Sequence, residues 1–258
     1  MLEWVVKDLV AVICLTLTRI RRAFAVLRFG ILVLRYAGLW AAIQKLGHQL
    51  YSRDVFIGTV KRLDDPPSQY TFNCYVALAS LEDIYEFFSN INSESSDGKY
   101  QLLVRKWYHE RGYGDCYVTK VKGTDEICAA RWMVTKKHLE GMGWLNLFSE
   151  IGDKDVLLEN VYVLERFRRM GVQQSGSRYM NEICLEMGFT HAKGWIAEDN
   201  IPELMACLKD DWLAFEKVVE RHFLFRVTRN IQERYTQPIP VHIPPQGKVT
   251  GLGEYDQG

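Results

Sequence analysis

The sequence predicts an α/β fold with a mixed sheet, preceded by a basic and apolar helical extension. Three observations support this prediction. The 258-residue chain is 48% apolar and 25% charged, which is typical of a globular domain with a sizeable core. Segments with strand and helix periodicity follow one another between residues 54 and 230. Residues 1–62 contain ten Lys/Arg and three Asp/Glu, although the formal net charge of the whole chain is zero.

The predicted extension, residues 1–53, contains apolar runs that charged residues interrupt. The run AFAVLRFGILVLRYAGLWAAI carries Arg28 and Arg35, whereas a membrane-spanning helix needs about 20 apolar residues without central charge. The arginine cluster at 19–22 follows the first apolar run, which is the reverse of the order in a signal peptide. Two interpretations stay open. Residues 1–50 lie as helices on the inner face of the membrane, or they pack on the domain or on a second subunit of a homodimer.

The body of the chain, residues 54–235, is predicted to begin with a strand, two helices and a β-hairpin. Alternating apolar residues predict the strands, and apolar residues on one helical face predict the helices. Gly123-Thr124-Asp125 separates the two strands of the hairpin. In order, these elements are a strand at 54–63, helices at 78–91 and 100–110, and strands at 115–121 and 126–136.

Strands and helices are then predicted to alternate, after a polar and aromatic connection at 136–154. Gly188 stands where a helix C-terminus favours glycine, and Pro202 falls in the first turn of a helix, where proline is tolerated. The tail, residues 236–258, holds four of the seven prolines and is predicted to be a loose extension. The elements are a strand at 155–164, a helix at 172–187, a strand at 191–198, a helix at 200–211 and a strand at 215–229.

Neither the cysteines nor the histidines have the spacing of a metal site. The six cysteines include no C-x-x-C pair, which predicts buried or free thiols in a reducing, cytoplasmic compartment. The six histidines are equally scattered. The sequence therefore predicts no metal, and the neutral net charge gives no indication of a nucleic-acid partner.

The stretch RFRRMGVQQSG, residues 166–176, places three arginines and a glycine where a strand gives way to a helix. A helix N-terminus presents unpaired N–H groups and partial positive charge, so it is a ready anion site. With the strand before it, this stretch resembles the Arg/Gln-x-x-Gly-x-Gly/Ala motif of the GNAT acyltransferase superfamily, with Arg168 and Gly171 in register. Gln173 departs from the family's Gly or Ala, and we expect it to crowd a pyrophosphate or to narrow the pocket.

A second resemblance to the family lies downstream of this motif. Asn200 follows a strand and opens a helix, as in the family. Cys207 stands where many members place the tyrosine that protonates the departing thiolate, and Asp211 replaces a glycine. The resemblance covers residues 54–230 and implies a GNAT-like acyl-CoA N-acyltransferase fold.

The resemblance implies that the chain binds acetyl-CoA or another acyl-CoA as a co-substrate. The strand around Val163 would pair with the pantetheine arm, and the backbone N–H groups of the loop would hold the pyrophosphate. The implied binding residues are Val161, Tyr162, Val163, Arg168, Arg169, Met170, Gly171, Val172, Gln173, Gln174 and Asn200.

Glu159 and Cys207 are the candidate catalytic residues. Simple alternation along the strand places Glu159 on the same face as Val163 and opposite to Tyr162. The resemblance implies a general base near Glu159 that deprotonates an amine through water; the alternative is a surface or ion-paired carboxylate. Cys207 is the candidate acid, with an ordinary thiol pKa of about 8.5; the alternative is a small buried apolar residue.

The predicted function is the transfer of an acetyl or other acyl group from acyl-CoA to an amine by direct attack in a ternary complex. The acceptor is a small molecule or a sugar, either free or lipid-linked. Two alternatives stay open. The departures at Gln173, Cys207 and Asp211 also suit a GNAT-fold module that binds without catalysis. A basic face would equally suit an acyl carrier protein as the donor.

Overall fold

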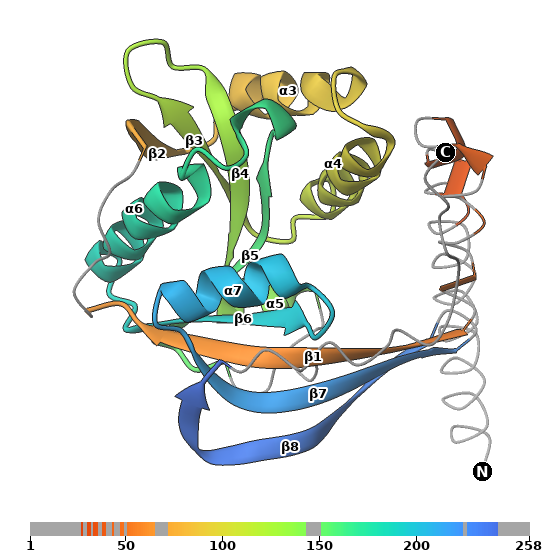
Figure 1. Ribbon diagram of the computed structural model, residues 1–258, viewed down its shortest axis with the longest axis vertical. Coiled ribbons are helices and arrows are strands. Elements are labelled where there is room, and N and C mark those ends of the chain that lie inside the picture. Colours follow the sequence, from red (N-terminus) through yellow and green to blue (C-terminus); the bar gives the residue numbers. More distant parts are fainter. Residues whose placement is uncertain are drawn as a thin grey trace, which may run out of the picture.

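Eight strands form one mixed sheet with helices on both faces (Figure 1). The computed structural model describes residues 51–64, 72–142, 151–223 and 226–241, together with scattered positions between 27 and 48. The strand order is β2-β3-β4-β5-β6-β1-β7-β8. All neighbouring strands are antiparallel except β5 and β6, which are parallel. This arrangement confirms the predicted mixed α/β class.

The elements follow the predicted order with several additions. The strands are β1 (Tyr51–Arg62), β2 (Cys74–Leu78), β3 (Asp115–Val121), β4 (Ile127–Val134), β5 (Asp155–Val163), β6 (His191–Ala197), β7 (Leu213–Phe223) and β8 (Arg226–Pro240). The α-helices are α3 (Leu81–Ser89), α4 (Ser96–His109), α5 (Lys136–Gly141), α6 (Val172–Glu186) and α7 (Ile201–Lys209). Two 3₁₀ turns are η1 (Asn90–Asn92) and η3 (Glu165–Phe167).

The sheet separates two apolar layers. On one face, Phe87 of α3 and Leu102 of α4 pack against Trp132 of β4. On the other face, Met180 of α6 contacts Met133 of the same strand, and α7 packs over β1 and β7. Every residue of β4 is buried, as expected for a central strand that is covered on both faces. The core therefore fixes β4 and β5 as the rigid centre from which the functional residues project.

Several helix ends carry the local signals that their sequences favour. Ser80 caps α3 and forms a reciprocal capping box with Asp83. Gly188 has a positive φ of 89° directly after α6, which confirms the predicted glycine cap. Pro202 lies in the first turn of α7, as predicted. The five cysteines that the structure describes are all buried and free, as the sequence predicted.

Some sequence-based boundaries are wrong. The strand predicted at 215–229 is two strands, β7 and β8, that form a hairpin. The sequence between the two strands, Leu224-Phe225, holds no Gly, Pro, Asn or Asp that would predict a break there. The predicted tail boundary at 236 lies inside β8, and the boundary at 54 lies inside β1. Prolines are tolerated in β8 because it is an edge strand.

The prediction missed two further elements and left one region untested. β2 precedes the first body helix, and α5 lies inside the connection predicted at 136–154. Most of the predicted extension, residues 1–53, lies outside the described residues, and so do residues 242–258. Both interpretations of residues 1–50 therefore stay predictions. No helix in the part that the structure describes is long and apolar enough to cross a membrane.

Candidate active site

A cleft opens where β5 and β6 separate. The two strands pair only over Asp155–Leu157 and His191–Lys193; beyond this, β5 follows β4 and β6 follows β1 (Figure 1). A cavity of about 340 Å³ lies between the separated parts of β5 and β6, and residues of both strands line it. A second hollow, of about 520 Å³, adjoins it on the side of the α6 N-terminus. Both share Val161, Gln173 and Glu203 in their walls, so they form one continuous cleft.

A β-bulge in β5 sets which side chains face the cleft. Glu159 pairs with Trp132 and Tyr162 pairs with Ala130, so β5 carries one more residue than β4 between these pairs. Asn160, in the bulge, has a positive φ of 55°. The extra residue shifts the alternation by one position. Glu159 therefore shares a face with Tyr162 and not with Val163, which corrects the prediction from simple alternation.

Arg105 of α4 holds the bulge in place. Its guanidinium group donates to the carbonyl oxygens of Asn160 and Val161, each at 2.9 Å. Arg168 donates in turn to the carbonyl oxygen of Val163 at 3.2 Å. The separation of β5 from β6 leaves strand carbonyl groups without a neighbouring strand, and these arginines satisfy them. A pantetheine arm predicted to pair here would therefore use strand N–H groups or displace Arg168, which is the more exposed arginine.

The aromatic ring of Tyr162 packs against the two arginines that contact β5. Both guanidinium groups, of Arg105 and Arg168, lie over its ring, with centroid distances of 5.0 and 5.2 Å. Its hydroxyl donates to the buried carboxylate of Glu94 at 2.6 Å. Glu94 also accepts the backbone N–H of Glu165 at 3.2 Å. Tyr162 thus lines the larger hollow, but its polar group serves to tie β5 to the segment before α4.

Replacement of Glu94 by alanine should reduce stability because it leaves the Tyr162 hydroxyl and the Glu165 N–H without acceptors. We expect the free energy of unfolding to fall by about 2–4 kcal/mol. Urea denaturation measures this change. Glu86→Ala, on the exposed face of α3, is the control and should alter stability by less than about 0.5 kcal/mol. Equal stability of the two variants would contradict this account of Glu94.

Glu159 lies in the wall of the 340 Å³ cavity. Burial raises the pKa of its carboxyl group. Three groups oppose this effect: the Tyr113 hydroxyl donates to it at 2.6 Å, Arg229 adds positive charge, and the backbone N–H of Trp195 donates to it. A carboxylate with a raised pKa is a stronger base than an exposed glutamate, and this one faces the cavity.

The loop between β5 and α6 has the form of an anion cradle. Arg169 and Gly171 both have positive φ, 65° and 82°, and α6 begins directly afterwards at Val172. The first turn of a helix presents N–H groups that lack intrahelical acceptors. The predicted binding residues line the 520 Å³ hollow together, with the exception of Met170, whose side chain is 49% exposed. The structure thus brings these residues together around one hollow, and their binding of phosphate stays a prediction.

Gln173 and Glu203 bridge the cleft. The Gln173 side-chain amide donates to the Glu203 carboxylate at 2.8 Å, joining the first turn of α6 to α7. Asn200, which opens α7, lies beside this bridge and lines both hollows. Gln173 and Glu203 both line the two hollows, so their hydrogen bond lies in the part of the wall that the hollows share.

Arg131 of β4 is a site residue that the sequence analysis missed. Its side chain is 1% exposed and lines the 340 Å³ cavity. It donates to Ser177 Oγ at 3.0 Å and to the Gln173 carbonyl at 3.4 Å, and its Nε has no hydrogen-bond partner among the described residues. Burial lowers its pKa to about 10. The sequence could have indicated Arg131, because it is the single charged residue in the otherwise apolar segment ICAARWMV.

A glycine in α6 makes room for this buried cation. A Cβ atom at Gly176 would lie 2.6 Å from Arg131 Nη2 and 2.9 Å from Thr119 Oγ1. These separations are too short for any side chain. The close approach of α6 to β4 thus depends on Gly176. The Arg131 side chain lies between this helix and the strand and reaches the cavity wall.

Cys207 lies in the wall of the same cavity but belongs to an apolar cluster. It is 6% exposed and packs with Leu204, Ile57 and Ala214. Burial raises the pKa of its thiol well above the usual range, and the neighbouring Glu203 adds to this effect. A thiol that is so weakly acidic is poorly suited to protonate a departing thiolate. The packing fits the alternative stated for Cys207, a small buried apolar residue.

Comparison with known proteins gives a match at the level of fold. No protein-family model matches the chain, and no curated protein sequence matches it either. A GCN5-related glucosamine N-acetyltransferase region in a fungal multi-domain β-N-acetylglucosaminidase aligns over 71% of this chain and 22% of that one, with 14% identity and a TM-score of 0.51. A GNAT-family acetyltransferase from Colwellia psychrerythraea aligns over 72% and 62%, with 13% identity and a TM-score of 0.46.

The comparison of folds rests on the first of these structures, of whose length this chain spans about a fifth. Its TM-score of 0.51 over 71% of this chain supports a match of the overall fold. The chain therefore has the fold of the GCN5-related N-acetyltransferases, as its sequence motifs predicted.

Proposed function

We propose that the chain is an N-acyltransferase that takes its acyl group from acyl-CoA. One observation carries the proposal. A single cleft has a half-buried carboxylate, Glu159, in one part of its wall and the predicted anion cradle of residues 168–174 in another. Such a cleft brings a base and a diphosphate site to the two ends of one extended thioester.

The cradle would hold the pyrophosphate of the donor. Backbone N–H groups at the start of α6 supply donors, and Arg168 and Arg169 supply charge. The thioester end would then pass the Gln173–Glu203 bridge into the 340 Å³ cavity. Because Gln173 lines both hollows, its side chain would contact the pantetheine arm or the acyl group.

Glu159 would act as the general base. It takes a proton from the acceptor amine, directly or through one water molecule, as the nitrogen attacks the thioester carbonyl. The new C–N bond forms, the C–S bond breaks, and the sulfur leaves as a thiolate. The proton held by Glu159 then returns to that thiolate through water. The protons and bonds of this reaction balance without an acid at Cys207, and we assign Cys207 a place in the cavity wall only.

The acceptor is proposed to carry an anionic group beside its amine. Arg131 is a buried cation in the cavity wall, and no carboxylate in the described residues pairs with it within 4 Å. A carboxylate or phosphate on the substrate would satisfy it. The amine itself is proposed to belong to a small molecule or a sugar, and the fungal structure with a TM-score of 0.51 is described as a glucosamine N-acetyltransferase.

A binding module without catalysis is the second candidate. Arg105 and Arg168 occupy three carbonyl groups of β5, and the Gln173–Glu203 bridge crosses the cleft. Both features restrict the space for an acyl-CoA whose pantetheine arm must lie along β5. Release of CoA in the presence of a panel of amines separates the two functions, because a module releases none.

Calorimetric titration with acetyl-CoA tests the cradle. Arg168→Ala/Arg169→Ala should weaken binding about tenfold or more, since two charge-assisted contacts to phosphate are lost. Arg166→Ala is the matched control: Arg166 belongs to the same loop, but it pairs with Glu126 and Asn90 and does not line the hollow. Equal affinity in all three proteins would contradict the cradle. A wild type that binds no acetyl-CoA would favour the module or a carrier-protein donor.

A further inference from the structure

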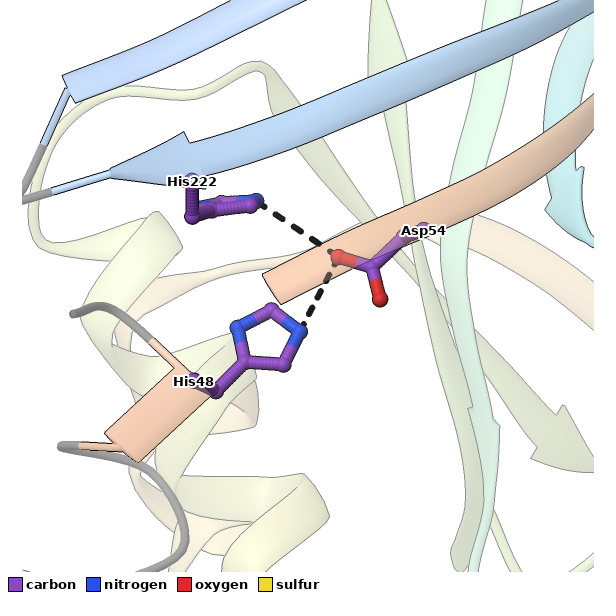
Figure 2. Close-up of side chains that lie close together, drawn as sticks. All are labelled: His48, Asp54 and His222. Carbon is purple, nitrogen blue, oxygen red and sulfur yellow. Dashed lines mark ion pairs between the residues drawn. The ribbon is translucent and has the colours of Figure 1, made fainter. Parts of the chain in front are cut away.

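Three side chains converge on one point outside the cleft (Figure 2). His48 precedes β1, Asp54 lies in β1 and His222 lies in β7. Both imidazole rings direct Nε2 at the same carboxylate oxygen, Asp54 Oδ2, from 3.0 Å and 3.7 Å. The three candidate ligand atoms all lie within 4.8 Å of one another. We propose that His48, Asp54 and His222 bind a divalent transition-metal ion of the zinc class.

The two histidine–aspartate separations suit such an ion. Two ligands bound at about 2.0–2.1 Å in tetrahedral geometry lie roughly 3.4 Å apart. The two observed Nε2–Oδ2 separations lie on either side of this value. Imidazole nitrogen and carboxylate oxygen are ligands that Zn²⁺ accepts. The side chains of His48, Asp54 and His222 are 39%, 29% and 12% exposed, so an ion can enter from solvent.

The surrounding charge also favours a cation. Glu220 lies directly opposite Asp54 across the β1–β7 pair, and like charges at opposed positions repel. Glu220 Oε2 is 3.8 Å from His222 Nε2, which places a second carboxylate beside the ligand group. Arg229 compensates the charge of Glu220, since its Nη1 lies 3.6 Å from Glu220 Oε1. A divalent ion would compensate the other carboxylate.

The site is separate from the cleft. In β1, Gly58 pairs with Trp195, whose backbone N–H contacts Glu159 in the cleft. Asp54 lies four residues before Gly58 in the same strand. Four residues of strand span about 13 Å. The ion would therefore join the segment that contains His48 to the ends of β1 and β7, and its role would be structural. His222 is remote in sequence from His48 and Asp54, so no local spacing predicts the set.

Zinc titration of the full chain, after treatment with a chelator, tests the site. Competition with a chromophoric chelator should show one Zn²⁺ per chain with micromolar or tighter affinity. Asp54→Asn and His222→Gln should each weaken binding more than tenfold. His191→Gln is the matched control, because His191 belongs to another His–Asp pair, with Asp155 at 3.6 Å, and should leave binding unchanged.

Two measurements on the wild type keep the test independent of how the variants fold. Zn²⁺ should raise the Tm of the wild type and of His191→Gln, since binding to the native state alone stabilises it. Co²⁺ should give the visible absorption of a four-coordinate nitrogen and oxygen site. If the wild type binds neither ion at micromolar concentration, the cluster is an ion-paired contact only. Equal zinc affinity in wild type and ligand variants places the ion elsewhere, and either result overturns the proposal.

Discussion

Replacement of Glu159 by glutamine is expected to lower turnover by about 10²- to 10⁴-fold, the usual contribution of a general base. Glutamine preserves the shape of the side chain but cannot accept the proton of the amine. The affinity for acyl-CoA should not change, because Glu159 lies outside the cradle hollow. Steady-state rates, measured together with calorimetric titration of acetyl-CoA, separate lost chemistry from lost binding.

Glu198→Gln is a suitable control for this prediction. Glu198 pairs with Lys217 at 2.6 Å and lines neither hollow, so its replacement should leave turnover nearly unchanged. If Glu159→Gln retains turnover within about threefold of the wild type, another group is the base. Retained binding of acetyl-CoA with no turnover in the wild type would instead favour the binding module.

The pH dependence gives a second measure of the role of Glu159. Burial raises its pKa, and the hydrogen bond from Tyr113 opposes that effect by stabilising the ionised carboxylate. Tyr113→Phe removes the hydrogen bond and should raise the pKa further. Because the ionised carboxylate is the active base, the acid limb of the kcat/KM profile should move to higher pH in Tyr113→Phe. An unchanged limb would exclude Glu159 as the titrating group.

The second large effect is expected at Arg131, where replacement by methionine should increase stability and reduce activity. Burial lowers the pKa of Arg131 from its usual value to about 10, so its charged form is disfavoured in the folded protein. This cost is fully present at neutral pH and would disappear only as pH rises above the folded pKa. Methionine fills a similar volume without charge, and we expect a gain of about 1–3 kcal/mol.

Thermal unfolding measures this gain, with roughly 2–4 °C in Tm for each kcal/mol in a chain of this size. Arg62→Met is the control, because the Arg62 side chain is 65% exposed and its replacement should have little effect on Tm. Acylation of amines that carry a carboxylate or phosphate should fall more than tenfold in Arg131→Met, whereas neutral amines should be affected less. A lower Tm with unchanged acceptor preference would show that Arg131 is structural.

The fold was readable from the sequence to the extent that its signals are local. Alternation and helical periodicity depend on neighbouring residues, so the order of elements between β1 and α7 was predicted except for β2 and α5, which were missed. The GNAT-like loop was also readable, because Arg168, Gly171 and the first turn of α6 are consecutive. The division into β7 and β8 was missed because the sequence between them, Leu224-Phe225, contains none of the residues that predict a break.

The candidate site was readable only in part, since its chemistry depends on residues that meet across the fold. Glu159 was identified, but the bulge at Asn160 changed the face on which it lies. Arg105 comes from α4 to hold that bulge, and no pattern in the sequence of α4 indicates this contact.

The sequence by itself determined most of the element order and the motifs that resemble the GNAT superfamily, because periodicity and motifs depend on residues that are close in the chain. Only the tertiary structure decided the separation of β5 from β6, the burial of Arg131 and the meeting of His48, Asp54 and His222. Burial, pKa and metal geometry depend on distances between residues that are remote in the chain. Such distances are fixed when the sheet and its helices pack together.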